Sequence, residues 1–204
     1  MNILQINSSI FGAGGQSTQL ADRLVSRLRK DGAQVTVRDL TRDPMPYLTA
    51  SGFGAFLAKP EERTGEQKAV ADFSDRLIEE LRQADVIVLG APMYNGGIPA
   101  QLKSWVDHVS RAGVTFRYTE KGPVGLLTGK KAYVLSSRGG IHVDTPHDNE
   151  TPHVRGILGL LGIVDVEFIY AEGLNMGEAP RDAAIRNAHA AIDLVAVTED
   201  QKAA

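Results

Sequence analysis

A stretch near the start of the chain is rich in hydroxyl groups and glycine and could hold an anion. Residues 7–18 read NSSIFGAGGQST, with four serine or threonine residues, three glycines and no charged side chain. We expect the anion to meet the hydroxyls of Ser9, Ser17 and Thr18 and the backbone N–H groups of Gln16 and Ser17, because Gln16 and Ser17 stand at the start of a predicted helix. Free backbone N–H groups and the helix dipole attract anions at such a position. The stretch therefore predicts a site for an anion such as a phosphate.

Other interpretations of residues 7–18 make different demands on the sequence. A nucleoside-triphosphate loop needs a lysine before a serine or threonine, and this stretch has no lysine. A dinucleotide loop needs G-x-G-x-x-G directly after a strand; Gly12 and Gly14 match two positions, but Ser17 occupies the third. Asp39 could imitate the acid that binds ribose in that motif. A plain capped helix start needs only a serine or threonine. A dinucleotide loop and a simple helix cap therefore both remain alternatives to the phosphate site.

A second loop offers groups suited to a flat heteroaromatic ring. Residues 91–98 read APMYNGGI and follow an apolar, strand-like run. Met93 and Tyr94 could form an apolar wall, while Asn95 and Gly96 could offer backbone amides. The alternative is that Met93 and Tyr94 are core residues. Their place between a buried strand and a helix opened by proline favours a binding site.

A third loop, residues 136–141, reads SSRGGI and adds Ser137, Arg138, Gly139 and Gly140. Consecutive glycines let the backbone approach a ligand closely. Arg138 could place a positive charge beside a ligand or could be solvated. Taken alone, this loop could equally be a plain turn, so its significance depends on its position relative to the other two loops.

The elements that must position these loops alternate between strand and helix patterns. Strands are predicted at residues 2–7, 34–39, 85–90, 131–136 and 164–171. Helices are predicted at residues 16–30, 65–83, 99–111, 151–161 and 180–195. The alternation predicts one α/β domain over residues 1–204, a flavodoxin-like three-layer sandwich. Its five-stranded parallel sheet would have the order 2-1-3-4-5 and helices on both faces. Ligands of such sheets bind beyond the carboxyl ends of the strands, where we expect the three loops to meet.

Two segments fall outside this alternation. Residues 40–64 contain several prolines and glycines and predict a long irregular loop, of the kind that is usually functional or mobile. Residues 114–127 are extended and turn-rich, and they predict a hairpin arm.

Composition narrows the class of protein. The chain has 204 residues, a net charge of −3 and no cysteine, which excludes disulfides, thiolate metal sites and a cysteine nucleophile. The charge argues against a nucleic-acid partner. From the pattern of these residues we expect no signal peptide and no membrane-spanning segment. We therefore expect a cytoplasmic protein that binds neither nucleic acid nor membranes.

Several motifs in a fixed order resemble the FMN-dependent NADH:quinone and azo-compound oxidoreductases, the bacterial azoreductase family, over nearly the whole chain. They are ILQINSS, PMYN, RAGVTFRYT, SRGG and EGLN. The resemblance implies FMN held non-covalently, with its phosphate at Ser9 and residues 15–17. Residues 93–96 and 137–140 would hold the ribityl chain and the isoalloxazine. It also implies a homodimer with two active sites at the interface.

The resemblance further implies that NADH or NADPH reduces FMN by hydride transfer and that a quinone or azo compound then enters the same pocket. No side chain need act as a catalytic group, because the flavin carries the reaction. Backbone N–H groups of Asn95 and Gly140 would stabilise charge on the reduced flavin. Tyr118 could line the substrate pocket across the dimer, or could be a surface residue, and His142 could touch substrate.

The chain departs from the family pattern in two places. Relatives commonly have an aromatic residue after the asparagine, whereas this chain has Asn95-Gly96-Gly97, which leaves the width of the substrate pocket open. Gly15 stands where a serine is common, which would remove one hydroxyl but keep the backbone donor.

A cluster of histidines and carboxylates follows the third loop. Its members are His142, Asp144, His147, Asp148, Glu150 and His153. The cluster has no fixed spacing on one element and contains two prolines, so we predict no metal site and interpret it as a polar lid over the flavin.

Two other functions compete with the flavin enzyme. A flavodoxin-like electron carrier would be strongly acidic and would lack the arm at residues 114–127. A hydrolase of the phosphodiesterase type would need a nucleophile or a metal, and the sequence has no G-x-S-x-G elbow.

Overall fold

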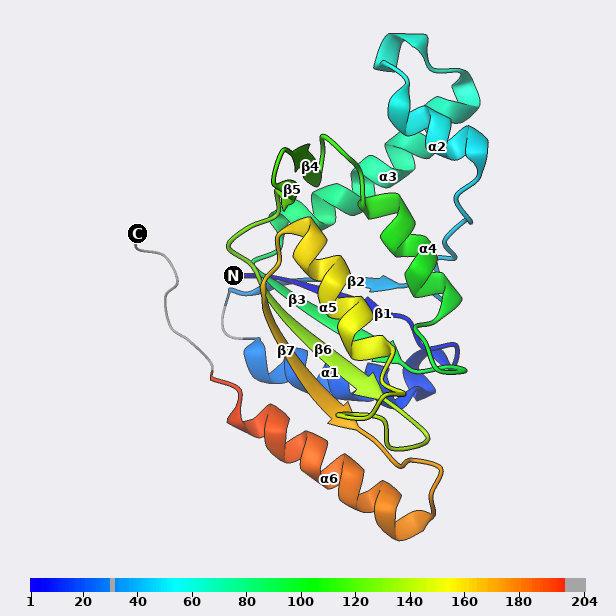
Figure 1. Ribbon diagram of the computed structural model, residues 1–204. Coiled ribbons are helices and arrows are strands. Elements are labelled where there is room, and N and C mark those ends of the chain that lie inside the picture. Colours follow the sequence, from blue (N-terminus) through cyan, green and yellow to red (C-terminus); the bar gives the residue numbers. More distant parts are fainter. Residues whose placement is uncertain (30–31, 197–204) are drawn as a thin grey trace.

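A five-stranded parallel sheet forms the centre of the molecule in the computed structural model, which describes residues 1–29 and 32–196 (Figure 1). The strands lie in the order β2-β1-β3-β6-β7. Their bounds are Asn2–Asn7 (β1), Gln34–Asp39 (β2), Val86–Pro92 (β3), Lys131–Ser137 (β6) and Asp165–Ala171 (β7). In chain order these are the five predicted strands, so the order 2-1-3-4-5 is confirmed. The three central strands are almost wholly buried, as apolar runs without alternation predict.

Helices cover both faces of the sheet, as Figure 1 shows. Their bounds are Gln16–Leu28 (α1), Gly65–Gln83 (α3), Ala100–Val109 (α4), Glu150–Leu161 (α5) and Glu178–Leu194 (α6). Leu24 of α1 and Ile192 of α6 share an apolar cluster on one face. On the other face, Leu77, Trp105 and Leu158 bring α3, α4 and α5 into a second cluster. The predicted helices are confirmed to within two residues; the predicted end of the first, at residue 30, lies outside the described residues.

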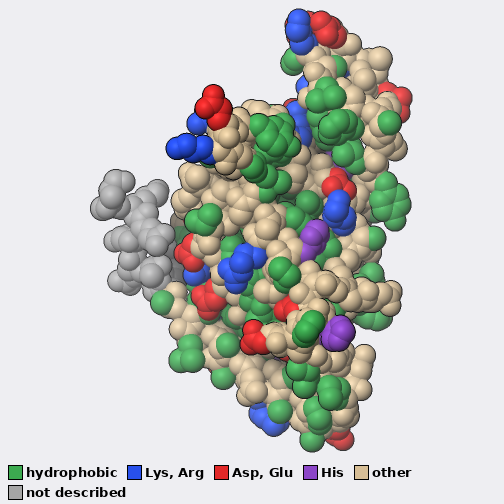
Figure 2. All heavy atoms as spheres, in the orientation of Figure 1, with side chains coloured by type: hydrophobic (Ala, Val, Ile, Leu, Met, Phe, Trp, Pro, Cys, Tyr) green, Lys and Arg blue, Asp and Glu red, His purple; other side chains and the backbone are tan. Residues whose placement is uncertain are grey.

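The segment between β2 and α3 is more ordered than predicted. Residues 40–64 contain helix α2 (Ala50–Leu57) and a short 3-10 helix, η2 (Pro60–Glu62). The sequence pattern hides α2 because two glycines interrupt it, but the Thr49 hydroxyl accepts the N–H of Gly52 and caps its start. The α2 region projects beyond the sheet in Figure 1, and apolar side chains lie on its surface in Figure 2.

The predicted hairpin arm is confirmed and lies at the amino ends of the strands. Strands β4 (Phe116–Thr119) and β5 (Gly122–Gly125) pair antiparallel. The N–H of Leu127 donates to the carbonyl of Leu161 at 2.8 Å, at the end of α5 that precedes β7. The arm is therefore at the opposite end of the sheet from the loops that follow β1, β3 and β6.

Candidate functional site

The loops that follow β1, β3 and β6 meet at one edge of the sheet, as predicted. The N–H of Ser8 donates to the carbonyl of Gly90 at 3.2 Å, and the N–H of Met93 donates to the carbonyl of Ser137 at 2.9 Å. The strand order reverses between β1 and β3, so this edge is the position where sheets of this kind bind ligands.

The loop after β1 contains a 3-10 turn, η1 (Gly12–Gly14), and closes tightly on itself. The Ser9 hydroxyl accepts the N–H of Phe11 at 3.2 Å and lies 3.2 Å from the Tyr94 hydroxyl, so it joins this loop to the loop after β3. A side-chain carbon at Gly15 would overlap the Ser9 hydroxyl. A side chain at the position of Gly15 would therefore force Ser9 to shift from the place it occupies here.

The start of α1 leaves polar groups without partners. Gln19 makes the first helical bond, donating to the carbonyl of Gly15 at 3.0 Å, so the N–H groups of Gln16, Ser17 and Thr18 precede the helical ladder. Gly15 is the N-cap and has no side chain to accept them. The hydroxyls of Ser17 and Thr18 are buried, and neither has a hydrogen-bond partner. Buried polar groups are almost always paired, so this corner fits an anion that accepts from hydroxyls and amides together.

The loop after β3 is a tight turn, and its backbone conformation explains why a glycine stands at position 96. The N–H of Tyr94 donates to the carbonyl of Gly97 at 2.9 Å, and the N–H of Gly97 donates back to Tyr94 at 3.1 Å. The two central residues have φ of 50° at Asn95 and 80° at Gly96, the conformation of a type I′ turn. No described residue accepts the N–H of Asn95. The Asn-Gly pair therefore sets the shape of the turn and leaves the N–H groups of Asn95 and Gly96 without an acceptor among the described residues.

The loop after β6 is held from the side by the loop after β7. The N–H groups of Gly173 and Asn175 donate to the carbonyls of Gly140 and Gly139 at 2.9 and 3.0 Å. A side-chain carbon on Gly139 would lie 2.6 Å from Nδ2 of Asn175. The His142 ring packs beside Gly140, and its Nδ1 is buried without a partner. The N–H of Gly140 has no acceptor in the described part of the chain, like that of Asn95.

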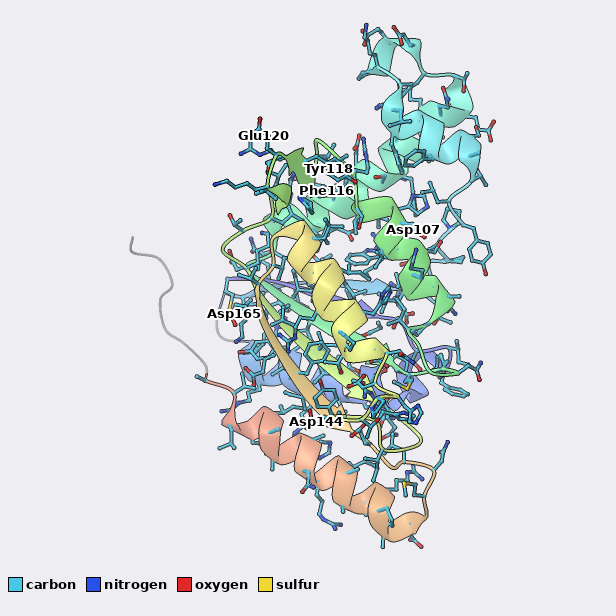
Figure 3. The ribbon with its side chains drawn as sticks, in the orientation of Figure 1. Asp107, Phe116, Tyr118, Glu120, Asp144 and Asp165 are labelled. Carbon is cyan, nitrogen blue, oxygen red and sulfur yellow. The ribbon has the colours of Figure 1, made fainter. Side chains whose placement is uncertain are left out.

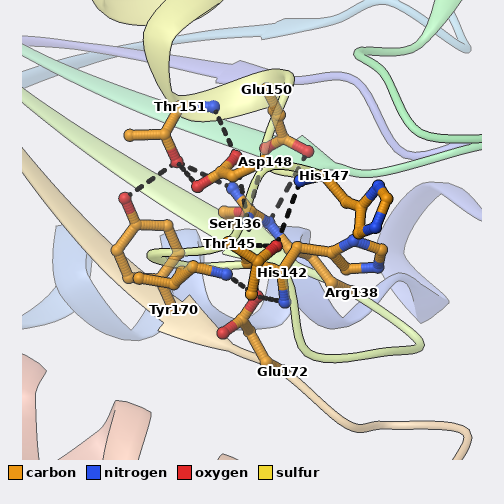
Figure 4. Close-up of polar contacts among 11 residues, drawn as sticks. Ser136, Arg138, His142, Thr145, His147, Asp148, Glu150, Thr151, Tyr170 and Glu172 are labelled. Carbon is orange, nitrogen blue, oxygen red and sulfur yellow. Dashed lines mark hydrogen bonds and ion pairs between the residues drawn. The ribbon is translucent and has the colours of Figure 1, made fainter.

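The Arg138 side chain points into the protein, so the solvated alternative is wrong. Its exposed fraction is 0%. Figure 4 shows its guanidinium among polar groups of β6, α5 and β7 and of the loops that follow β6 and β7. We name this set the Arg138 cluster; its members are Ser136, Arg138, Asp148, Glu150, Thr151, Tyr170 and Glu172.

Glu150 is the most deeply buried acid of the Arg138 cluster. Its side chain is fully buried, its Oε1 accepts the Ser136 hydroxyl at 2.8 Å, and its Oε2 has no hydrogen-bond partner. The pKa of Glu150 is raised to about 7, chiefly by burial and also by the negative charges of Asp148 and Glu172, against the opposing effects of Arg138 and the Ser136 bond. The cluster therefore holds a carboxyl group that changes its charge near neutral pH.

Tyr118 lies far from the three loops of its own chain. It is 75% exposed on β4, and its ring meets Phe116 edge to face at 5.4 Å. Figure 3 places Tyr118 at one end of the molecule and Asp144, in the loop after β6, at the other. The seven-residue strands between these ends span roughly 20 Å. One chain therefore cannot bring Tyr118 to its own loops.

The histidine and carboxylate cluster after β6 divides between two environments. Asp148 and Glu150 turn inward to Arg138, whereas Asp144, His147 and His153 are exposed. Over the described ranges, no three His, Asp or Glu side chains are placed to hold a metal ion. No helix in the same ranges is long and apolar enough to cross a membrane.

The family is decided by comparison with known proteins. A family model described as flavodoxin-like fold matches residues 1–195. The chain belongs to this flavodoxin-like family. An FMN-dependent NADH:quinone oxidoreductase from Burkholderia lata is 53% identical over 192 residues, which cover 93% of this chain and 97% of the relative. Among solved structures, azoreductase AzrA superposes with a TM-score of 0.88 at 25% identity, covering 97% of this chain and 99% of that one. An azoreductase from Bacillus anthracis strain Sterne superposes with a TM-score of 0.84 at 25% identity, covering 95% and 99%.

Sequence reasoning missed the residues that support the loop after β6. Glu172, Thr151, Tyr170 and Asn175 were not predicted to take part in the site. Glu172 follows β7, whose carboxyl end shares the sheet edge with β6. A carboxylate directly after a neighbouring strand was the signal that could have identified it.

Proposed function

We propose that the chain is an FMN-dependent NADH:quinone oxidoreductase that also reduces azo compounds. The observation that carries the FMN part of this conclusion is the pair of buried, unpartnered hydroxyls of Ser17 and Thr18 at the helix start, which fit its phosphate. The B. lata relative carries the quinone oxidoreductase name, and both structural neighbours are azoreductases. None of these three is named as an electron carrier or a hydrolase.

The phosphate of FMN would lie at the start of α1. Gln16 and Ser17 would donate backbone N–H groups, and Ser17 would add its hydroxyl. Ser9 and Gly15 would shape this corner, because Ser9 occupies the space that a side chain at Gly15 would need. This arrangement uses the neutral donors and the helix dipole and needs no lysine or arginine.

The rest of the flavin would lie against the two remaining loops. Met93, Tyr94, Asn95 and Gly96 would hold it on one side. On the other side would stand the backbone of Ser137, Arg138, Gly139 and Gly140. The free N–H groups of Asn95 and Gly140 would meet the pyrimidine edge and N5. We assign Arg138 its role through its backbone, since its guanidinium is turned away into the Arg138 cluster.

When bound, FMN supplies the transfer of two electrons from NADH to a quinone or azo compound. The chain supplies binding, orientation and fixed N–H dipoles, which stabilise negative charge without reorganising. His142 stands next to Gly140 and would contact the substrate. No catalytic side chain is assigned.

The test of this function separates its two half-reactions. We expect the purified protein with FMN to lose its flavin absorbance on addition of NADH without oxygen. Addition of a quinone, or separately an azo dye, should restore it. A protein that binds FMN but is not reduced by NADH would contradict the oxidoreductase assignment and favour a carrier.

We further propose a homodimer in which Tyr118 completes the partner's site. The support is its position: Tyr118 is 75% exposed on an arm at the far end from its own loops. Mixing two inactive variants tests this. Ser17→Asp should repel the phosphate, and Tyr118→Ala should impair the substrate pocket. A mixed dimer would then contain one intact site, so activity should return on mixing; if mixing restores nothing, Tyr118 does not act across an interface.

A further inference from the structure

A single guanidinium ties together the segments beneath Gly139 and Gly140. Arg138 Nε donates to the Ser136 hydroxyl at 2.9 Å, and Nη2 donates to the Thr151 hydroxyl at 2.9 Å. Its Nη1 lies 3.2 Å from Asp148 Oδ1 and 3.3 Å from Glu172 Oε1. The group also lies over the Tyr170 ring, 5.0 Å from its centre. Arg138 therefore connects β6, the start of α5, β7 and the loops beside them (Figure 4).

Glu172 links the Arg138 guanidinium to the backbone of the loop after β6. Its Oε1 accepts the N–H of His142 at 2.8 Å and the N–H of Val143 at 3.0 Å, besides the contact with Arg138. The glycine pair at residues 139–140 is thus bracketed, by Arg138 on one side and by these two bonds on the other. The loop after β7 holds both glycine carbonyls as well. The glycines have no side chains that could fix their position. The Glu172 carboxylate restrains them instead through its bonds to the backbone of the two residues, His142 and Val143, that follow this stretch.

We propose that Arg138 and Glu172 are positioning residues of the flavin site: Arg138 orients the Glu172 carboxylate, and Glu172 fixes the turn that presents the Gly140 N–H. The proposal rests on the proposed FMN-dependent function. Neither side chain need touch the flavin; both act through the backbone of residues 139–143. A donor held in place in this way stabilises charge that develops on the flavin better than a mobile one does.

The charges of the Arg138 cluster must nearly balance, because its ionisable side chains are buried. One guanidinium faces three carboxylates, those of Asp148, Glu150 and Glu172, whose side chains are 10%, 0% and 14% exposed. Three ionised carboxylates would leave the cluster strongly negative. Glu150 can relieve this by carrying a proton, because one of its oxygens has no donor. Glu172 then remains the anion that pairs with Arg138 and accepts the two backbone N–H groups.

The test compares Glu172→Ala with Glu172→Gln and with a control, Glu167→Ala. Glu167 lies on β7, the strand that Glu172 follows, but it pairs with Lys131 at the other end of the sheet. In Glu172→Ala we expect amide exchange at His142 and Val143 of the FMN-free protein to accelerate at least about tenfold. FMN affinity should fall about tenfold, and the midpoint potential of bound flavin should become more negative. Glu172→Gln keeps an acceptor oxygen and should recover part of each effect; Glu167→Ala should match the wild type.

Two results would overturn the proposal. Unchanged exchange at His142 and Val143 in Glu172→Ala would show that Glu172 does not fix the turn. Faster exchange with unchanged FMN affinity and potential would show that the turn has no part in presenting a donor. If Glu172→Ala does not fold, the same measurements on Glu172→Gln decide. A wild-type protein that binds no FMN would instead overturn the proposed function, and the exchange data would still report whether Glu172 fixes the turn.

Discussion

The loop after β1 and the loop after β6 stand at the same sheet edge but satisfy their polar groups in opposite ways. At the start of α1, the Ser17 and Thr18 hydroxyls are buried without partners. Under the loop after β6, Arg138 uses each of its nitrogens in a bond or ion pair, and its side chain is 0% exposed. The first loop has buried hydroxyls without partners, whereas the Arg138 side chain beneath the second loop has a partner at every nitrogen.

The difference separates groups that bind a ligand from groups that position others. Unpartnered buried hydroxyls cost stability in the empty protein and gain a partner only when an anion arrives. The Arg138 guanidinium has all its partners before any ligand binds, and it makes the backbone above it rigid. Removing a side chain from the first loop should therefore weaken binding without weakening the fold, whereas removing one from the Arg138 cluster should weaken the fold as well.

The largest effect is expected for Arg138→Met, which should lower the free energy of unfolding by about 3–5 kcal/mol, because three carboxylates lose their buried partner. Urea unfolding measures it. Arg155→Met is the control: Arg155 is exposed and lies over Phe168 at 5.0 Å, so its loss should cost below about 1 kcal/mol. Equal losses in the two variants would show that the Arg138 cluster does not stabilise the fold.

The next effect is the pH dependence caused by Glu150. Its pKa is about 7 in the folded protein against an ordinary value of 4.5, so the folded state holds the proton more tightly. The free energy of unfolding should therefore fall as pH rises from about 4.5 to 7 and then level off, by about 3 kcal/mol in total from this group.

Glu150→Gln should abolish that contribution. The free energy of unfolding of Glu150→Gln minus that of the wild type should become more positive from pH 5 to pH 8. Glu178→Gln, at an exposed position, should show the same dependence of unfolding free energy on pH as the wild type. Unfolding curves that stay parallel for wild type and Glu150→Gln would show that Glu150 does not titrate in this range.

A smaller effect distinguishes the first loop. Ser17→Ala should weaken FMN binding by about 1–2 kcal/mol, because a hydroxyl contact to the phosphate is lost. The free energy of unfolding of the FMN-free protein should not fall, because the hydroxyl has no partner to lose. Fluorescence titration and urea unfolding provide the two numbers. A destabilised protein with unchanged FMN affinity would reverse the proposed roles of the two loops.

The smallest effect concerns the turn after β3. Gly96→Ala should destabilise the protein by about 1 kcal/mol, because an alanine is strained at a φ of 80°. Gly97→Ala has open space and no positive φ, so it should be neutral. Thermal unfolding compares the two. Equal stabilities would mean that the type I′ turn does not constrain Gly96.

Much of this architecture could be predicted because local patterns determine it. The buried central strands are apolar runs, and the Asn95-Gly96 pair is a turn signal readable from two residues. The strand order then places the loops after β1, β3 and β6 together. Helix α2 was missed because its stability depends on packing against α3 and on the Thr49 cap, which a pattern containing two glycines does not reveal.

The Arg138 cluster could not be predicted, because its contacts join residues far apart in the chain. Arg138 and Glu172 are 34 positions apart, and no periodicity connects them. Sequence reasoning left Arg138 either beside a ligand or in solvent. Whether a charged side chain after a strand faces outward or folds beneath the loop depends on the carboxylates that α5 and β7 bring to it, and these appear only in the folded chain.

The roles proposed for all three loops depend on the start of α1 holding the phosphate of FMN. Titration of the FMN-free protein with FMN and with riboflavin, which lacks the phosphate, tests this directly. We predict that FMN binds about a hundredfold or more tightly than riboflavin, and that Ser17→Ala narrows the gap by weakening FMN alone. Equal affinities for FMN and riboflavin would contradict the claim.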